Sequence, residues 1–401
     1  MTPHPSFAIR GSWLPLVLGM IVAGCGAATP GGSSRVGTDP ARGPAAGEEL
    51  PRTIVTPDGV SDVPELYAEA RRTLEAGDAR TAAQRFDRIV RLDPDGELAP
   101  DALYLAALAH EEAGDRQAAL ERFEQLARRY PEHPLGREAI VRAMRLLVFF
   151  ERFARAESLA DRALSQKLTF GVIEQTVVHS SKALGLLARG EVEAASLHVE
   201  KARGLIEDNR LDSAGQIPRD LAQAYFALGE VRRVRADAIR FDPVPPDFAR
   251  VLEERCQHLL DAQRAYSDTM RAYDSHWSAM AGYRVGELYK RLHDDLMRMP
   301  KPKAADTDAR AQLFEGAMRL RYSVLLDKAL AMMEHTLQMA KRTGEASAWV
   351  VKAEQARREL EQARKKENEA IAKLPYTRAQ LQQALDDLQQ KKRTEKQAGG
   401  A

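Results

Sequence analysis

Two segments of the chain repeat one pattern. The stretch "LYAEARRTLEAGDARTAAQRFDRIVRLDP" runs from Leu66 to Pro94, and "LYLAALAHEEAGDRQAALERFEQLARRYP" runs from Leu103 to Pro131. At an offset of 37 residues they agree at 12 of 29 aligned positions without a gap. Self-similarity at such a period is typical of a solenoid, in which each repeat buries its apolar face against the next.

The residue types within the repeat predict two antiparallel helices. Ala82 and Phe86 lie four residues apart, the spacing of an apolar stripe on one helical face. Gly77 supplies the turn between the helices, and Asp78 is placed to cap the second helix through its carboxylate. Pro94 ends that helix because it has no backbone N–H to donate. The sequence therefore predicts an all-α chain.

The pattern continues more faintly towards the C-terminus. "LLARGEVEAASLHVEKA" surrounds Gly190, and "AYFALGEVRRVRADAI" surrounds Gly229. A third turn is expected at Glu151, where the glycine is missing. Turns predicted at residues 77, 114, 151, 190 and 229 extend the solenoid over residues 61–240.

This pattern resembles the tetratricopeptide repeat, a pair of antiparallel helices with small residues at their close contacts. The resemblance implies a groove lined by the first helix of each repeat, which binds peptides or partner domains. Tyr67, Arg71, Tyr104 and Leu108 fall at the corresponding positions. The Lys/Asn set of the carboxylate-clamp subfamily is absent there. An ordinary role in packing between repeats is the open alternative for these four side chains.

Further helices are expected beyond the solenoid. Prolines in "FDPVPPDF" interrupt the array, and apolar residues at 3–4 spacing then predict one long helix or a helix pair over residues 247–300. Its apolar face either packs on the solenoid or forms an inter-chain coiled coil. A helical region is predicted over residues 306–395, its last helix starting with a capping box at Thr377. Residues 396–401 are expected to form a disordered tail.

The N-terminus has the features of an export signal. Residues 1–24 contain an apolar run too short to span a bilayer. The sequence Val22-Ala23-Gly24-Cys25 resembles the lipobox of bacterial lipoproteins, which implies cleavage between Gly24 and Cys25 and acylation of Cys25, for example with palmitate. Gly26, rather than aspartate, follows the cysteine. In Gram-negative lipoproteins this implies transport to the outer membrane, facing the periplasm. Residues 25–60 predict a flexible Gly/Pro/Ser linker.

Composition and motifs narrow the function. The chain carries 59 Lys and Arg against 58 Asp and Glu, a balance that argues against a nucleic-acid binder. Cys256, the second of two cysteines, is expected to be a buried apolar side chain or an intermolecular half-cystine. No metal-ligand cluster, nucleophile elbow or phosphate loop is found in the sequence. We therefore expect no enzyme activity, no metal and no cofactor beyond the lipid on Cys25.

The function that remains is that of a scaffold for protein–protein interactions in an envelope assembly, secretion or motility machine. "AALERFEQLARRYPEHPLGREAI" resembles the repeat lipoprotein of the β-barrel assembly machine, and long repeat lipoproteins of Arg/Ala-rich composition occur in gliding motility. The resemblance implies outer-membrane β-barrel or periplasmic proteins as partners, with the membrane reached through the lipid. The alternative is a periplasmic binding or regulatory module for a cell-wall enzyme or a peptidoglycan fragment.

Overall fold

A computed structural model describes residues 53–56, 59–166, 168–212, 217–301, 305–383 and 385–386. The predicted signal peptide, Cys25, most of the predicted linker and the predicted tail lie outside the described residues. The described chain divides into two compact units, here called the N-terminal unit (up to Glu174) and the C-terminal unit (from Gln175). This division falls inside the array that the sequence predicts over residues 61–240.

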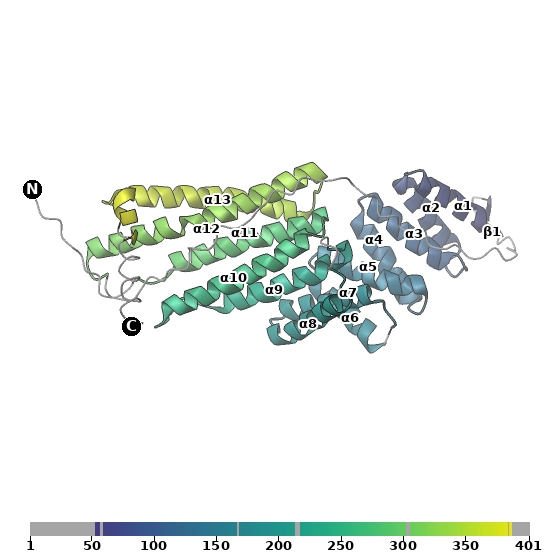
Figure 1. The fold of residues 1–401 in the computed structure, drawn as a ribbon. Helices are drawn as coiled ribbons and strands as arrows, with labels where there is room; N and C mark the ends of the chain where they lie inside the picture. The colour runs from purple at the N-terminus through teal and green to yellow at the C-terminus, as the bar shows by residue number, and fades with distance from the viewer. Residues whose placement is uncertain are drawn as a thin grey trace, which may run out of the picture. The chain divides into compact units, whose positions relative to one another are not determined.

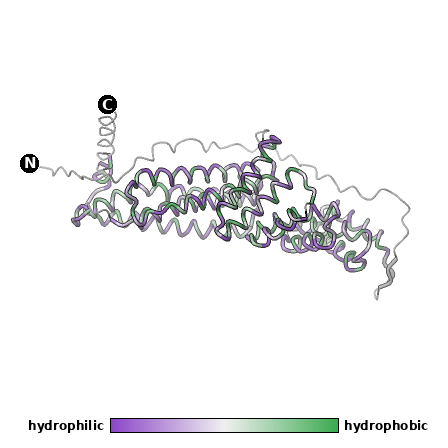
Figure 2. The backbone as a smooth tube through the Cα atoms, turned by 90° about the horizontal axis from the view of Figure 1, so that it is seen from below, coloured by the Kyte–Doolittle hydropathy of each residue, from purple (hydrophilic) through white to green (hydrophobic). Residues whose placement is uncertain are grey.

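The described residues form helices almost throughout, which confirms the all-α solenoid-type fold (Figure 1). Hydrophobic and hydrophilic residues both recur along the helical parts of the backbone, as amphipathic packing requires (Figure 2). The elements of the N-terminal unit are β1 (Thr53–Thr56), β2 (Gly59–Asp62), α1 (Val63–Glu75), α2 (Ala79–Leu92), α3 (Ala99–Glu112), α4 (Arg116–Arg129), α5 (Pro134–Phe149) and α6 (Phe153–Ser165). Those that follow are α7 (Val172–Ala188), α8 (Val192–Asp208), the 3₁₀-helix η1 (Arg219–Leu221), α9 (Ala222–Ala238), α10 (Phe248–Met270), α11 (Ser275–Met297), α12 (Asp308–Thr343) and α13 (Ala348–Ala372).

A short β-hairpin precedes the first helix and corrects the predicted linker boundary at residue 60. The strands β1 and β2 pair antiparallel, with Thr56 opposite Gly59. The sequences Thr-Ile-Val-Thr and Gly-Val-Ser-Asp explain the two strands, because their β-branched residues favour extended backbone. Ordered backbone therefore begins earlier than the linker prediction allows.

The four turns between paired helices confirm the predicted repeat. Gly77, Gly114 and Gly190 have φ angles of 83°, 85° and 81°, the left-handed region that glycine enters without a steric cost. Glu151 takes the same conformation with φ 55° although it is not glycine. The third turn thus keeps the backbone of the repeat without its usual residue.

The buried side chains of α2 and α4 also agree with the predicted repeat. Phe86 of α2 and Phe123 of α4 are fully buried, and Ala82 and Ala119 precede them on the same buried faces. The two rings occupy equivalent places in consecutive helix pairs and give the N-terminal unit its repeating core.

The prediction of a turn at Gly229 is wrong. This glycine is buried inside α9. A Cβ atom on Gly229 would lie 2.5 Å from Cε1 of the Tyr266 ring on α10. The glycine therefore permits a close helix–helix contact, and the repeat pattern ends before α9.

The C-terminal unit contains long helices that pack in sequence order. α9 packs on α10, α10 on α11, α11 on α12 and α12 on α13. Residues 247–300 form a helix pair rather than one helix, and the Asp274 carboxylate caps α11 by accepting from the Trp277 N–H at 3.0 Å. The predicted capping box is present: Gln380 N–H donates to Thr377 Oγ1 at 3.3 Å, and Thr377 N–H donates to Gln380 Oε1 at 2.8 Å.

A buried charge network crosses α9, α10 and α11. The Glu230 carboxylate of α9 accepts from the Tyr266 hydroxyl at 2.5 Å and from Arg233 at 2.8 Å, and Arg284 Nε of α11 lies 2.9 Å from it. Further ion pairs join Asp237 of α9 to Arg255 of α10 at 2.9 Å. Since charges leave water at a large cost, such a cluster is stable only when each member finds partners.

Glu151 provides a direct test of the third turn. Replacing Glu151 with glycine should stabilise the N-terminal unit by about 0.5–1 kcal/mol, because glycine removes the steric penalty of the left-handed conformation. Gly77→Ala should destabilise by about 1 kcal/mol, since no atom lies within 4 Å of its added Cβ and only the φ of 83° penalises it. Urea unfolding followed by circular dichroism measures both changes. Equal signs for the two variants would contradict the assignment of position 151.

Candidate interaction surface

The predicted groove tyrosines belong to the packing between paired helices. The Tyr67 ring of α1 meets Phe86 edge-on with centroids 5.8 Å apart, and the Tyr104 ring of α3 meets Phe123 in the same way at 6.0 Å. Tyr104 is only 5 % exposed, so it does not line an open groove. Its hydroxyl donates to Glu138 of α5. For Tyr104, packing between repeats replaces the predicted groove role.

The other three predicted residues retain surface exposure. Tyr67 is half-buried, and burial, together with the nearby Asp101 carboxylate, raises the pKa of its hydroxyl to about 12. Arg71 keeps 38 % of its side chain exposed and pairs with Glu75 at 3.3 Å. Leu108 is half-buried on α3. Tyr67, Arg71 and Asp101 influence one another electrostatically across α1 and α3, so these first helices carry a mixed polar surface.

Sequence reasoning missed Arg142 of α5. Its Nε donates to Glu138 at 3.2 Å, and its guanidinium also lies 3.7 Å from Glu111 of α3. The guanidinium carbon is 5.7 Å from the Tyr104 ring centroid and 5.9 Å from that of Phe123. Arg142 therefore joins the first helices of two repeats. Its spacing from Tyr104 is close to one repeat length, which is the only signal the sequence offers.

Ion pairs also join the second helices of consecutive repeats. Arg122 of α4 donates twice to Asp87 of α2, at 2.6 and 3.0 Å, and His110 of α3 lies 3.0 Å from the same carboxylate. Burial opposes ionisation of Asp87, but hydrogen bonding to Arg122 and to His110 outweighs burial and holds the pKa of Asp87 below its usual value. Arg155 of α6 repeats the contact with Glu124 of α4 at 2.6 Å.

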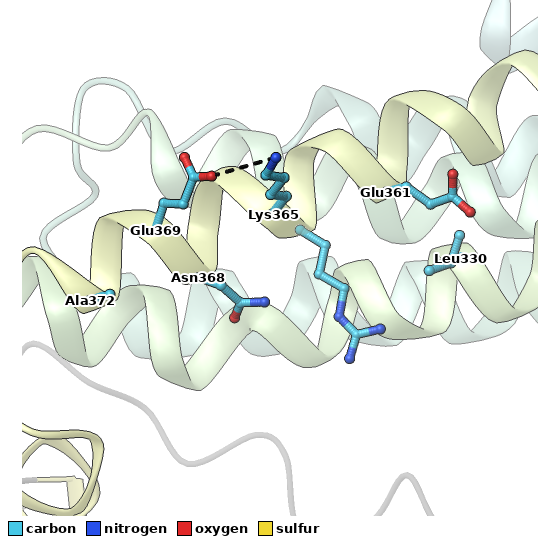
Figure 3. A pocket seen from close by; sticks show the side chains of 7 residues that line it. Leu330, Glu361, Lys365, Asn368, Glu369 and Ala372 are labelled. Atoms are coloured by element: carbon cyan, nitrogen blue, oxygen red, sulfur yellow. Dashed lines mark ion pairs between the residues drawn. The ribbon is translucent and has the colours of Figure 1, made fainter.

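A shallow hollow of about 570 Å³ lies between α12 and α13 of the C-terminal unit (Figure 3). Leu330 of α12 forms its apolar floor, and its rim comes from α13: Glu361, Arg364, Lys365, Asn368, Glu369 and Ala372. Lys365 pairs with Glu369 at 3.9 Å on this rim. Paired charges around a single leucine make a solvated surface rather than a pocket of convergent titratable groups.

Two further histidines meet between α7 and α8. The Nδ1 atoms of His179 and His198 lie 3.0 Å apart. Burial and the neighbouring His198 lower the pKa of His179 to about 4. Within the part of the chain that the structure describes, no three His, Cys, Asp or Glu side chains gather where they could hold a metal ion.

Cys256 is buried on α10 and forms no disulfide. Burial raises the pKa of its thiol to about 11, so the reactive thiolate is scarce at neutral pH. This agrees with the buried-side-chain prediction. Gly24 and Cys25, the predicted cleavage and lipidation residues, lie outside the described residues. No helix in the described ranges combines the length and apolar character needed to cross a bilayer.

Comparison with known proteins supports the repeat at one place. Residues 101–133, which contain α3 and α4, match the tetratricopeptide repeat family model. No curated protein resembles the chain closely enough to count as a relative.

Two solved structures show distant similarity. A tetratricopeptide repeat protein from Parabacteroides merdae ATCC 43184 is 12% identical, with 74% of this chain and 98% of that one covered and a TM-score of 0.40. A monomeric IFIT1 mutant with m7Gppp-AAAA is 14% identical, with 76% of this chain and 72% of that one covered and a TM-score of 0.38. The match to the tetratricopeptide repeat covers α3 and α4, which lie within the α-solenoid of the described residues.

Proposed function

We propose that the protein is a non-catalytic scaffold that binds other proteins in an envelope assembly, secretion or motility machine. It is anchored to the outer membrane by lipid on Cys25 and faces the periplasm. Tetratricopeptide repeats serve as surfaces for protein–protein contacts, and residues 101–133 match that repeat.

The observation that carries the proposal is the stacking of consecutive helix pairs through contacts between repeats. Tyr104–Glu138, Arg122–Asp87 and Arg155–Glu124 each join one repeat to the next. Links on both the first and the second helices fix the spacing of the side chains that remain at the surface. A surface held in this way meets a partner with little loss of conformational entropy on binding.

The membrane anchor rests on the sequence Val22-Ala23-Gly24-Cys25 and on the chain between it and the hairpin. Some 27 residues separate Cys25 from Thr53. The composition predicts a flexible linker there, and a flexible chain of that length has a root-mean-square reach of about 26–31 Å. On this prediction the folded units would work at some distance from the lipid surface while attached to it.

Replacing Cys25 with serine should remove the protein from the outer-membrane fraction, because serine offers no sulfur for acylation. Membrane fractionation followed by immunoblotting measures the distribution. Cys256→Ala is the matched control: it removes the other cysteine, which is buried, and should leave the distribution unchanged. An unaltered outer-membrane pool in Cys25→Ser would exclude acylation as the anchor.

The scaffold function itself is tested by co-purification from detergent-solubilised membranes. We expect the tagged full chain to recover outer-membrane β-barrel or periplasmic proteins reproducibly, as identified by mass spectrometry. Those proteins should be lost when Phe123→Ala disrupts the repeat core. Recovery of lipid alone would count against the scaffold.

A further inference from the structure

The third turn of the repeat differs from the others in its side chains. The first two turns read Glu-Ala-Gly-Asp, at residues 75–78 and 112–115, whereas the third reads Phe-Phe-Glu-Arg at residues 149–152. The left-handed backbone is nevertheless the same in all three, at Gly77, Gly114 and Glu151. The chain has therefore kept the turn and replaced the groups it presents.

This replacement gives up two stabilising features. Glycine is lost from a left-handed position, where Glu151 bears a steric penalty. The helix cap is lost as well: Asp78 and Asp115 each accept from a backbone N–H at 3.1 Å, but α6 has no side-chain cap at Arg152. Folding alone favours the residues of the first two turns, so the third turn satisfies a different requirement.

In exchange, the third turn presents a cluster of rings and guanidinium groups. This cluster, here called the aromatic edge, comprises Phe149, Phe150, Arg116 and Arg152. Both phenylalanines are half-buried, and their rings meet edge-on with centroids 5.0 Å apart. The Arg116 guanidinium carbon lies 4.7 Å from the Phe149 centroid, and that of Arg152 lies 4.9 Å from Phe150.

The negative charge of the turn is lost at the same time. Arg152 replaces the aspartates of the first two turns, Phe149 replaces the exposed glutamates Glu75 and Glu112, and Glu151 with Arg152 leaves the four residues without net charge. Arg152 donates to the neutral amide oxygen of Gln117 at 2.9 Å and forms no ion pair within the described residues. Its positive charge is thus available to an incoming carboxylate.

We propose that the aromatic edge docks a protein segment in which an apolar side chain is flanked by carboxylates. The rings would contact the apolar side chain, and the Arg152 guanidinium would pair with an acid. Aromatic residues and arginine are the types that dominate binding energy at protein interfaces. The proposal deepens the scaffold function and rests on it.

The test uses the purified full chain carrying Cys25→Ser and a fluorescein-labelled peptide of glutamates interspersed with leucine and phenylalanine. Phe149→Glu combined with Phe150→Ala installs the residues that the first two turns carry at these positions and should weaken binding at least tenfold. Glu112→Ala, at the equivalent place in the second turn, should leave binding unchanged. A peptide with lysine in place of glutamate should bind at least tenfold more weakly. Equal affinities for the double variant and its parent would overturn the proposal.

A second, less disruptive substitution keeps the test valid if the double variant fails to fold. Arg152→Gln keeps both rings, and it should weaken binding of the glutamate peptide severalfold and reduce its salt dependence. Circular dichroism checks that helicity is retained. Binding that is indifferent to both salt and Arg152→Gln would exclude the electrostatic half of the proposal.

Two further experiments distinguish this proposal from lipid binding and from failure of the scaffold function. If anionic phosphatidylglycerol vesicles bind the parent but not the Phe149→Glu/Phe150→Ala variant, while the peptide binds neither, the aromatic edge contacts lipid and the proposal is overturned. In co-purification, loss of envelope proteins with the double variant supports the docking site. Recovery of the same proteins by both forms contradicts the site but leaves the scaffold intact, whereas recovery by neither contradicts the scaffold itself.

Discussion

Glu230→Ala should destabilise the C-terminal unit by about 3–5 kcal/mol, the usual cost of removing one member from a buried charge cluster. The substitution deprives Arg233 and Arg284 of a carboxylate at 2.8 and 2.9 Å, and leaves the fully buried Tyr266 hydroxyl without its acceptor. Urea unfolding followed by tryptophan fluorescence reports on this unit, because Trp277 and Trp349 both belong to it.

An exposed ion pair supplies the control for Glu230. Glu193 of α8 pairs with Arg235 at 3.1 Å, but 85 % of its side chain is exposed. Solvent-exposed pairs of this kind contribute about 0–1 kcal/mol, so Glu193→Ala should have little effect. Similar losses in the two variants would mean that burial does not set the strength of the Glu230 cluster.

The same carboxylate makes the C-terminal unit sensitive to acid. Burial opposes the charge of Glu230, but Arg284 and Arg233 outweigh it and lower the pKa from 4.5 to about 2. A depressed carboxyl pKa contributes stability at pH values above 4.5, and this stability is lost as the pH falls towards 2. Glu230→Gln, which carries no charge, should therefore show a flatter dependence of unfolding free energy on pH across that window.

The turns show what local sequence can predict. Gly77 and Gly114 stand where the chain needs a positive φ, and each is followed by an aspartate that caps the next helix. Both requirements act within a few residues, so the sequence displays them directly. Glu151 was predictable from its register, because the backbone conformation belongs to the repeat rather than to the glycine.

Long-range packing was not predictable in this way. Gly229 has a turn-like neighbourhood, but its role depends on Tyr266, which lies on another helix. Tyr104 occupies a first-helix position expected to face a groove, yet Phe123 and Glu138 enclose it. The error at Gly229 and the choice left open at Tyr104 have one cause: a single helix shows which of its faces is apolar and does not show which neighbour covers the rest.

The burial of charged residues on α9 and α11 was also not predictable from the sequence. Arg and Glu at helical spacing normally indicate a solvated face, since lone charges are rarely buried. Here Glu230, Arg284 and Tyr266 from three helices satisfy one another in the core. Only the packing of α9, α10 and α11 brings them together, so the candidate sites that depend on such meetings had to come from the structure.

Phe123→Ala should destabilise the N-terminal unit by about 3–5 kcal/mol, the usual cost of truncating a buried aromatic side chain. The Phe123 ring is fully buried and makes an edge-on contact with Tyr104, so its removal opens a cavity between α3 and α4 and forfeits that contact. Urea unfolding followed by far-ultraviolet circular dichroism measures the change. Phe86→Ala, the equivalent position in the first repeat, should give a loss in the same range.

A solvent-facing residue completes this test of the repeat. Leu164 of α6 is 40 % exposed, so Leu164→Ala should cost less than about 1 kcal/mol because little apolar surface is lost from the core. If Phe123→Ala costs no more than Leu164→Ala, the ring does not fill a closed core and the register of the repeat is wrong. A large loss at Phe123 and Phe86 alone would show that both rings serve one repeated structural role, as the offset of 37 residues predicts.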